Sequence, residues 1–162
     1  MRVLRFLVAF SALFLVASQA QAKCGDNVGD EAAVAAARAA ANAACDCDSF
    51  TNHGQYVKCV KDIAIARTKT DPPLLPKNCK GSVIKCAAKS TCGKPGFVTC
   101  CKTSSTGKVK CSTKPNASKC TPPSNGSACV SGQSSCCDAC LLNGDCVPSP
   151  SGAFLDGAPA GF

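Results

Sequence analysis

The chain has 162 residues, a formal net charge of +8, 16 cysteines, 1 histidine, 1 tyrosine and no tryptophan. This length corresponds to one domain or to two small ones. A single histidine argues against a zinc site built from histidines, and the scarcity of aromatic rings argues against a surface that stacks nucleic-acid bases.

Residues 1–22 have the pattern of a secretory signal peptide. Arg2 and Arg5 give a positive start, residues 6–17 are almost entirely apolar, and residues 20–22 form a small-x-small cleavage site. The apolar run is too short to span a bilayer. We therefore expect a secreted or periplasmic/extracellular protein without a transmembrane segment, whose mature part starts at the next residue.

All 16 cysteines lie after this segment, and their even number allows eight disulfides with no thiol left over. Only 22 Val, Ile, Leu, Phe and Tyr side chains follow residue 22. Such an inventory buries too little surface to offset a backbone ordering cost of about 1–2 kcal/mol per residue. Each disulfide typically contributes about 2–4 kcal/mol. We predict a small disulfide-rich fold, stabilised by disulfides, with short α-helices plus a β-hairpin.

Composition divides the chain into four parts. Residues 1–22 are the signal peptide, and residues 23–119 are a helical disulfide-rich domain with a basic hairpin region. Residues 120–146 are dense in cysteine and contain no lysine or arginine. Residues 147–162 are rich in Pro, Gly, Ser and Ala, and we expect a flexible tail.

The first predicted helix covers residues 31–44, of which ten are alanine, the best helix former. Asp30 is a suitable N-cap, and Glu31 in the first turn complements the helix dipole. We expect a spacer helix that Cys45 and Cys47 fix at its end.

A second helix is predicted after Asn52, which forms a capping-box pattern with Gln55. One buried face is expected from residues at i, i+3, i+4 and i+7 spacing, namely Tyr56, Cys59, Val60 and Ile63. Cys59 then points inward, and Cys45 or Cys47 is its nearest candidate partner.

A short third helix is predicted over residues 82–91, with Ser82 as its cap and Gly93 and Pro95 ending it. Residues 97–102 and 108–111 then predict a hairpin around the loop 103–107.

Within this hairpin, strand alternation sends Cys100 and Cys101 to opposite faces. They should therefore bond to two different partners.

The last six cysteines have the spacing C-x8-C-x6-C-C-x2-C-x5-C, formed by Cys120, Cys129, Cys136, Cys137, Cys140 and Cys146. This spacing resembles the inhibitor cystine knot of small toxins and protease inhibitors. The resemblance implies a knottin-like C-terminal module with the bridges Cys120–Cys137, Cys129–Cys140 and Cys136–Cys146. It also implies an alternative function, inhibition of a protease or a channel.

Ten further cysteines are expected to be disulfide-bonded, with partners that the sequence leaves open: Cys24, Cys45, Cys47, Cys59, Cys79, Cys86, Cys92, Cys100, Cys101 and Cys111. The Cys45-x-Cys47 motif, residues 52–56 and Thr99-Cys100-Cys101 loosely resemble uncharacterised exported bacterial cysteine-rich proteins. This resemblance implies no activity.

Catalytic and metal chemistries find little support in the residues. Cys137-x2-Cys140 has zinc or redox spacing, but it lacks a second pair and His53 is the only histidine. No G-x-S-x-G motif is present. We expect a non-catalytic protein without metal or cofactor, whose cysteines form structural bridges.

No acidic residue occurs between Asp71 and Asp138, whereas ten lysines lie in this stretch: Lys77, Lys80, Lys85, Lys89, Lys94, Lys102, Lys108, Lys110, Lys114 and Lys119. Such a block either is a solvated surface that maintains solubility or attracts an anionic envelope or extracellular polymer. The absence of arginine favours diffuse attraction over bidentate or sequence-specific nucleic-acid recognition. Asn116 and Asn125 begin N-glycosylation sequons, which matter in a eukaryotic source. We predict an exported interaction protein with the lysine block as its contact surface.

Overall fold

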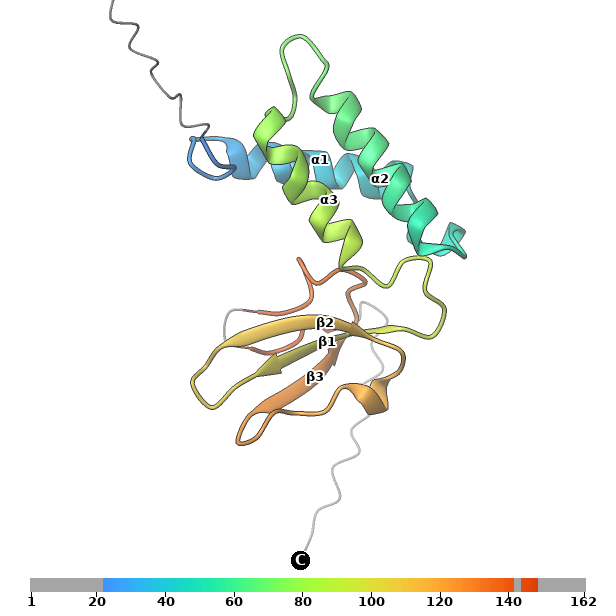
Figure 1. Cartoon of the computed structure of the whole chain (residues 1–162), viewed down its shortest axis with the longest axis vertical. Coiled ribbons are helices and arrows are strands. Elements are labelled where there is room, and N and C mark those ends of the chain that lie inside the picture. Colours follow the sequence, from blue (N-terminus) through green and yellow to red (C-terminus); the bar gives the residue numbers. More distant parts are fainter. Residues whose placement is uncertain (1–21, 142–143, 149–162) are drawn as a thin grey trace, which may run out of the picture.

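Three α-helices lie at one end of the molecule and a three-stranded antiparallel sheet lies at the other (Figure 1). This computed structural model describes residues 22–141 and 144–148. The predicted signal peptide, apart from its last residue, and the predicted tail from residue 149 onward lie outside the described residues. No helix of the described part is long and apolar enough to cross a membrane. The expectation of a small disulfide-rich fold is confirmed.

Helix α1, Asp30–Ala44, begins one residue earlier than predicted. Gly29 is the N-cap with a φ of 94°, a left-handed conformation that glycine adopts readily. Asp30 is therefore the first helical residue, and the prediction that it caps the helix is wrong. Its carboxylate accepts hydrogen bonds from the main-chain N–H of Gly25 at 2.9 Å and of Asn27 at 3.4 Å, so it orders the preceding turn.

Helix α2, His53–Arg67, follows a short 3₁₀ turn, η1, at Cys47–Ser49. The main-chain N–H of Gln55 donates to Asn52 Oδ1 at 3.2 Å, which confirms Asn52 as the cap. Tyr56 and Val60 are buried as predicted, whereas Cys59 and Ile63 are half-buried. The disulfide Cys45–Cys59 joins α1 to α2 and confirms one of the two partners considered for Cys59.

The core between the helices consists largely of small side chains and cystine sulfur. Its buried members are Ala37, Ala41, Cys45, Tyr56, Val60, Ala64, Leu75, Cys79, Val83, Ala87 and Cys92. Alanines on facing helices let the backbones approach closely but bury little apolar area each. The disulfides Cys24–Cys79 and Cys47–Cys92 reinforce this core.

Helix α3 covers Lys80–Ala88, so the predicted range 82–91 and the predicted cap at Ser82 are wrong. The 3₁₀ turn η2, Lys77–Cys79, leads directly into the helix and starts it early. The helix ends early because the N–H of Thr91 donates to the carbonyl of Ser134 at 2.8 Å. The chain thus leaves α3 to contact the segment that lies between the helices and the sheet.

Strands β1, Val98–Thr103, and β2, Val109–Lys114, form the predicted hairpin. A third strand, β3 at Ser127–Ser131, pairs with the other edge of β1 and was not predicted. The strand order is therefore β2-β1-β3, with β1 in the centre.

The sheet register places one cysteine of each strand in a row, because Cys101 lies opposite both Cys111 and Cys129. Directly opposite residues share a face of the sheet, and we call this face the inner face. Its three cysteines bond to the segment 136–146 through Cys111–Cys136, Cys101–Cys140 and Cys129–Cys146. The segment, red in Figure 1, is thus fixed across the strands in the order β2, β1, β3.

The knottin pairing implied by the spacing is wrong. Cys120 bonds to Cys100 on the opposite, outer face of β1, and Cys137 bonds to Cys86 on α3. The prediction that Cys100 and Cys101 have two different partners is confirmed. Of the bridges that involve residues 120–146, only Cys129–Cys146 is internal to that segment, so it is not a self-contained knot. All sixteen cysteines are paired, as the count predicted.

Trypsin digestion of the unreduced protein tests this pairing. No Lys or Arg follows Lys119, so residues 120–162 stay in one peptide. Four bridges attach this peptide to residues 86–89, 90–102 and 111–119, namely Cys86–Cys137, Cys100–Cys120, Cys101–Cys140 and Cys111–Cys136. The bridges Cys47–Cys92 and Cys45–Cys59 add residues 39–58 and 59–61 to the same product. We expect mass spectrometry to detect these peptides together until reduction. An unattached, fully oxidised 120–162 peptide would contradict the fold and support the knottin pairing.

A second prediction concerns Gly93, where the chain passes the start of α2. Its φ is +70°, and a Cβ there would lie 2.5 Å from the Asn52 carbonyl carbon. Gly107 has a similar φ of +76° with nothing within 4 Å, so it serves as the matched control. We expect Gly107→Ala to cost only the left-handed strain of about 1–2 kcal/mol. Gly93→Ala should cost a further 1–3 kcal/mol or so from the backbone clash, measured by guanidinium unfolding with disulfides intact. Equal losses would contradict the close approach.

Candidate functional site

The ten lysines between Asp71 and Asp138, which we call the basic block, lie in several parts of the fold. Four lie on or beside the hairpin, namely Lys102, Lys108, Lys110 and Lys114. Four lie on or beside α3, namely Lys77, Lys80, Lys85 and Lys89. Lys94 lies between α3 and β1, and Lys119 ends the 3₁₀ turn η3 at Ala117–Lys119.

The outer face of the sheet carries three of these lysines. Lys102 on β1 lies directly opposite Lys110 on β2, and Lys114 follows on the same face of β2. Opposite residues of antiparallel strands have Cβ atoms about 4.5–5.5 Å apart, so the two ammonium groups repel each other. The bridge Cys100–Cys120 ties the segment that ends at Lys119 onto this face. Lys119 of η3 is thus the residue before a cysteine that is bonded to this face.

A second group lies on α3. Lys85 and Lys89 are exposed and, with Ser82, line a hollow of about 310 Å³. The rest of its lining consists of the disulfides Cys86–Cys137 and Cys111–Cys136. The hollow therefore offers two ammonium groups and one hydroxyl above cystine sulfur, without a carboxylate in its lining.

Lys94 differs from the other members of the block. Its ammonium group donates to the main-chain carbonyl of Ser90 at 3.1 Å and lies 5.9 Å from the centre of the Phe97 ring. Burial lowers the pKa of Lys94 below its ordinary value. This lysine supports the turn after α3, so it contributes less to the exposed basic surface than the sequence predicted.

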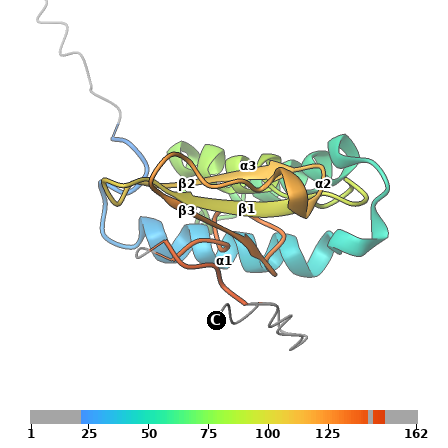
Figure 2. The same cartoon turned by 90° about the horizontal axis from the view of Figure 1, so that it is seen from below.

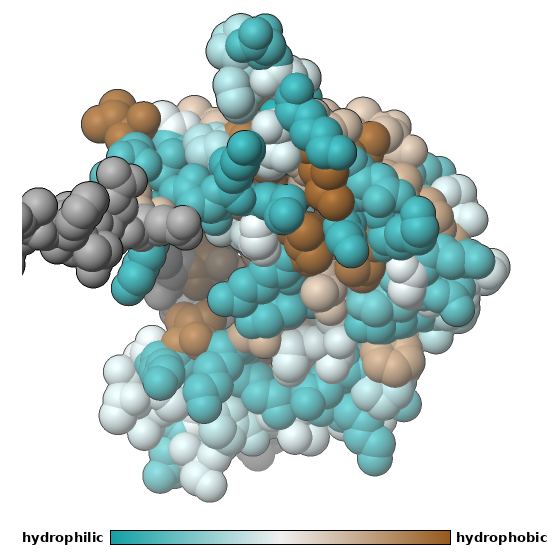
Figure 3. All heavy atoms as spheres, turned by 45° about the horizontal axis from the view of Figure 1, so that its top comes forward, coloured by the Kyte–Doolittle hydropathy of each residue, from teal (hydrophilic) through white to brown (hydrophobic). Residues whose placement is uncertain are grey.

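Two ion pairs of the described residues, Arg38–Asp138 and Lys58–Asp62, use carboxylates without a lysine of the basic block. The face of the molecule in Figure 3 is mostly hydrophilic, with hydrophobic side chains in small groups. On this face, polar side chains rather than apolar area therefore make up most of what a partner would meet.

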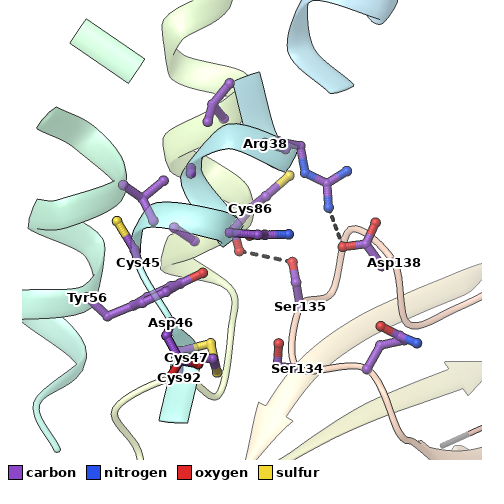
Figure 4. A pocket seen from close by; sticks show the side chains of 16 residues that line it. Arg38, Cys45, Asp46, Cys47, Tyr56, Cys86, Cys92, Ser134, Ser135 and Asp138 are labelled. Carbon is purple, nitrogen blue, oxygen red and sulfur yellow. Dashed lines mark hydrogen bonds and ion pairs between the residues drawn. A yellow bond between two sulfur atoms is a disulfide. The ribbon is translucent and has the colours of Figure 1, made fainter. Parts of the chain in front are cut away.

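A separate cavity lies between the helices and the segment 133–138, and we call it the interlayer cavity. It encloses about 260 Å³ and is lined by residues of all three helices and of this segment. Figure 4 shows Arg38 of α1 paired with Asp138 at one side of it, and the hydroxyl of Tyr56 pointing into it. The hydroxyl of Ser135 donates to the carbonyl of Cys86 at 3.2 Å, next to the Cys86–Cys137 bridge.

Sequence reasoning missed this cavity. The one available signal is Arg38, a lone arginine within the alanine-rich helix, where a charged side chain has no local partner. Its partner Asp138 is 100 residues further along the chain, so only the fold reveals the pair.

Burial raises the pKa of the Tyr56 phenol above its ordinary value of 10.0, and the carboxylate of Asp138 raises it further while Arg38 lowers it. The phenol is thus held in its neutral form, able to donate and to accept a hydrogen bond. It has no hydrogen-bond partner among the residues that the structure describes.

His53 and the cysteine clusters have structural partners. The ring nitrogens of His53 lie 2.8 Å from the carbonyl of Cys92 and 3.3 Å from that of Ala88, so the ring joins α2 to α3. Two groups have the spacing of metal ligands, Cys101 with Cys111 and Cys140, and Cys24 with Asp30 and Cys79. Every cysteine in them is disulfide-bonded, and a disulfide sulfur is not the thiolate that binds metals.

Comparison of the chain with protein-family models, curated proteins and solved structures finds no match. The structure itself defines the class: a small disulfide-rich protein of three short helices and a three-stranded antiparallel sheet.

Titration of Tyr56 tests the interlayer cavity. The chain has one tyrosine and no tryptophan, so absorbance at 295 nm reports this group alone. We expect a midpoint above 10.0 in the folded protein, and the ordinary value after reduction and unfolding. Since the folded state holds the proton more tightly, the stability linked to this group is present below the unfolded pKa and is lost as pH rises through the folded pKa.

Asp138→Asn should lower the midpoint, because it removes the carboxylate that raises the pKa and leaves Arg38 in place. Asp62→Asn on the exposed side of α2 is the control and should leave it unchanged. A midpoint at the ordinary value in the folded protein would contradict the burial of the phenol.

Proposed function

We propose that this is an exported, non-catalytic interaction protein that binds anionic envelope or extracellular polymers through the exposed lysines of the basic block. The observation that carries the proposal is the clustering of lysines in two places: Lys102 opposite Lys110 on the outer sheet face, and Lys85 with Lys89 around one hollow on α3. Like charges placed directly opposite each other destabilise a sheet. A bound polyanion would relieve this repulsion, whereas the free protein tolerates it.

The chemistry of the side chains favours a repeating anion over a single small one. Lysine is a compact, hydrated point charge on a flexible stem, so it attracts phosphate or sulfate groups without fixing their geometry. Lysines spread over β1, β2, η3 and α3 match a polymer that carries charge along its length. Binding of this kind weakens strongly as salt rises.

The disulfides support an oxidising compartment. Eight bridges without a free thiol accord with a protein exported from a reducing cytosol, as the pattern of residues 1–22 predicts. The alternative of a knottin inhibitor loses its basis, since the implied cystine knot does not form.

Charge-matched variants test the proposal on a heparin column. Lys102→Gln/Lys110→Gln/Lys114→Gln removes the lysines of the outer face. The control, Lys23→Gln/Lys61→Gln/Lys69→Gln, removes the same charge from exposed sites outside the block. We expect the wild type and the control to elute at similar salt, and the outer-face variant to elute clearly earlier. In titrations with fluorescent heparin, each lost contact should reduce the slope of log K against log salt by somewhat less than one, roughly 0.7–0.9.

Two outcomes would contradict the proposal. Passage of the wild type through the column at low salt would exclude polyanion binding. Equally early elution of both triple variants would show that only net charge matters and that the outer face is not a contact surface.

A further inference from the structure

The interlayer cavity is built differently from the surface that carries the exposed lysines of the basic block. No lysine lines it, and the ion pair Arg38–Asp138 on its lining has no net charge. The other charged residue in the cavity lining is Asp46, whose carboxylate accepts a hydrogen bond from the N–H of Asp48 at 3.3 Å. The cavity therefore lacks the positive charge that would attract an anion.

Neutral polar groups dominate the lining instead. The side-chain amides of Asn42 and Gln133 and the hydroxyls of Tyr56 and Ser134 line the cavity, and none of these groups has a hydrogen-bond partner in the described part of the chain. Each of them both donates and accepts. The four groups come from α1, α2 and the segment 133–138. The bridge Cys86–Cys137 joins this segment to α3, which also lines the cavity.

The base of the cavity is apolar. Ala41, Val60, Val83 and Ala87 line it and are all buried at 4 % exposure or less. A ligand that matches both parts has hydroxyl groups at its edge and C–H groups on its face, which is the chemistry of a sugar ring. The volume of about 260 Å³ is below the roughly 300–1,000 Å³ of pockets for drug-sized ligands, so it suits one ring.

We propose that the interlayer cavity binds a single neutral sugar ring, with the hydroxyls of the ring bonded to Asn42, Tyr56, Gln133 and Ser134. This inference is independent of polyanion binding, because it uses different residues and no net charge. The protein would then have two separate binding sites, one for a neutral sugar and one for an anionic polymer.

The test is a titration of the ¹⁵N-labelled, fully oxidised protein with glucose, galactose, mannose and N-acetylglucosamine, followed by NMR. At least one sugar should shift the side-chain amide signals of Asn42 and Gln133 in a saturable way, and raised salt should leave its affinity unchanged. Each of the variants Tyr56→Phe, Asn42→Ala and Gln133→Ala should weaken binding about three- to tenfold, the value of one neutral hydrogen bond. Gln55→Ala, an exposed amide of α2 outside the cavity, is the matched control and should bind like the wild type.

Tyr56→Phe keeps the ring and removes a hydroxyl without a protein partner, so its spectrum should show an intact fold. The inference is overturned if none of the four sugars shifts the cavity signals at tens of millimolar. It is also overturned if binding survives in all three cavity variants. A parallel titration uses glucuronate, a charged sugar. If glucuronate alone binds and salt abolishes this binding, the inference is overturned and the binding is assigned to the lysines of the basic block.

Discussion

The fold depends on a row of three disulfides across the inner face of the sheet. Cys111, Cys101 and Cys129 lie side by side on the three strands, and their partners follow one another in the segment 136–146. A sheet this small has too little apolar surface to be stable alone. Covalent bonds from every strand to one covering segment take the place of that surface, and they fix the strand order β2-β1-β3 at the same time.

Two adjacent cysteines connect this row to the helices. Cys136 bonds to β2, and Cys137, its neighbour in the turn 136–138, bonds to α3. The helical end has its own three disulfides and its own core of alanine and cystine. The bridge Cys86–Cys137, the pair Arg38–Asp138 and hydrogen bonds such as that from the Thr91 N–H to the Ser134 carbonyl hold the segment 133–138 against the helices, and the interlayer cavity lies between them. In the view from below, the strands appear between α1 on one side and α2 and α3 on the other (Figure 2).

The same arrangement leaves the two candidate sites chemically distinct. The inner face is occupied by disulfides, and the lysines of the two hairpin strands lie on the outer face. In the segment 133–138, the carboxylate of Asp138 is paired with Arg38. Positive charge thus collects on the outside, and neutral amides and hydroxyls collect between the layers.

The sequence by itself determined the features that depend on near neighbours. The alanine-rich helix, the Asn52 cap, the hairpin and the divergence of Cys100 and Cys101 all follow from residues a few positions apart. The complete pairing of sixteen cysteines follows from their number. Tertiary structure alone decided the partners of those cysteines, the third strand and the cavity. Ser127–Ser131 is too short to be recognised as a strand until β1 pairs with it, and Cys137 meets Cys86 only because the two ends dock. Spacing within residues 120–146 carried no information about α3 or β1, so the resemblance to a knot could not reveal the true partners.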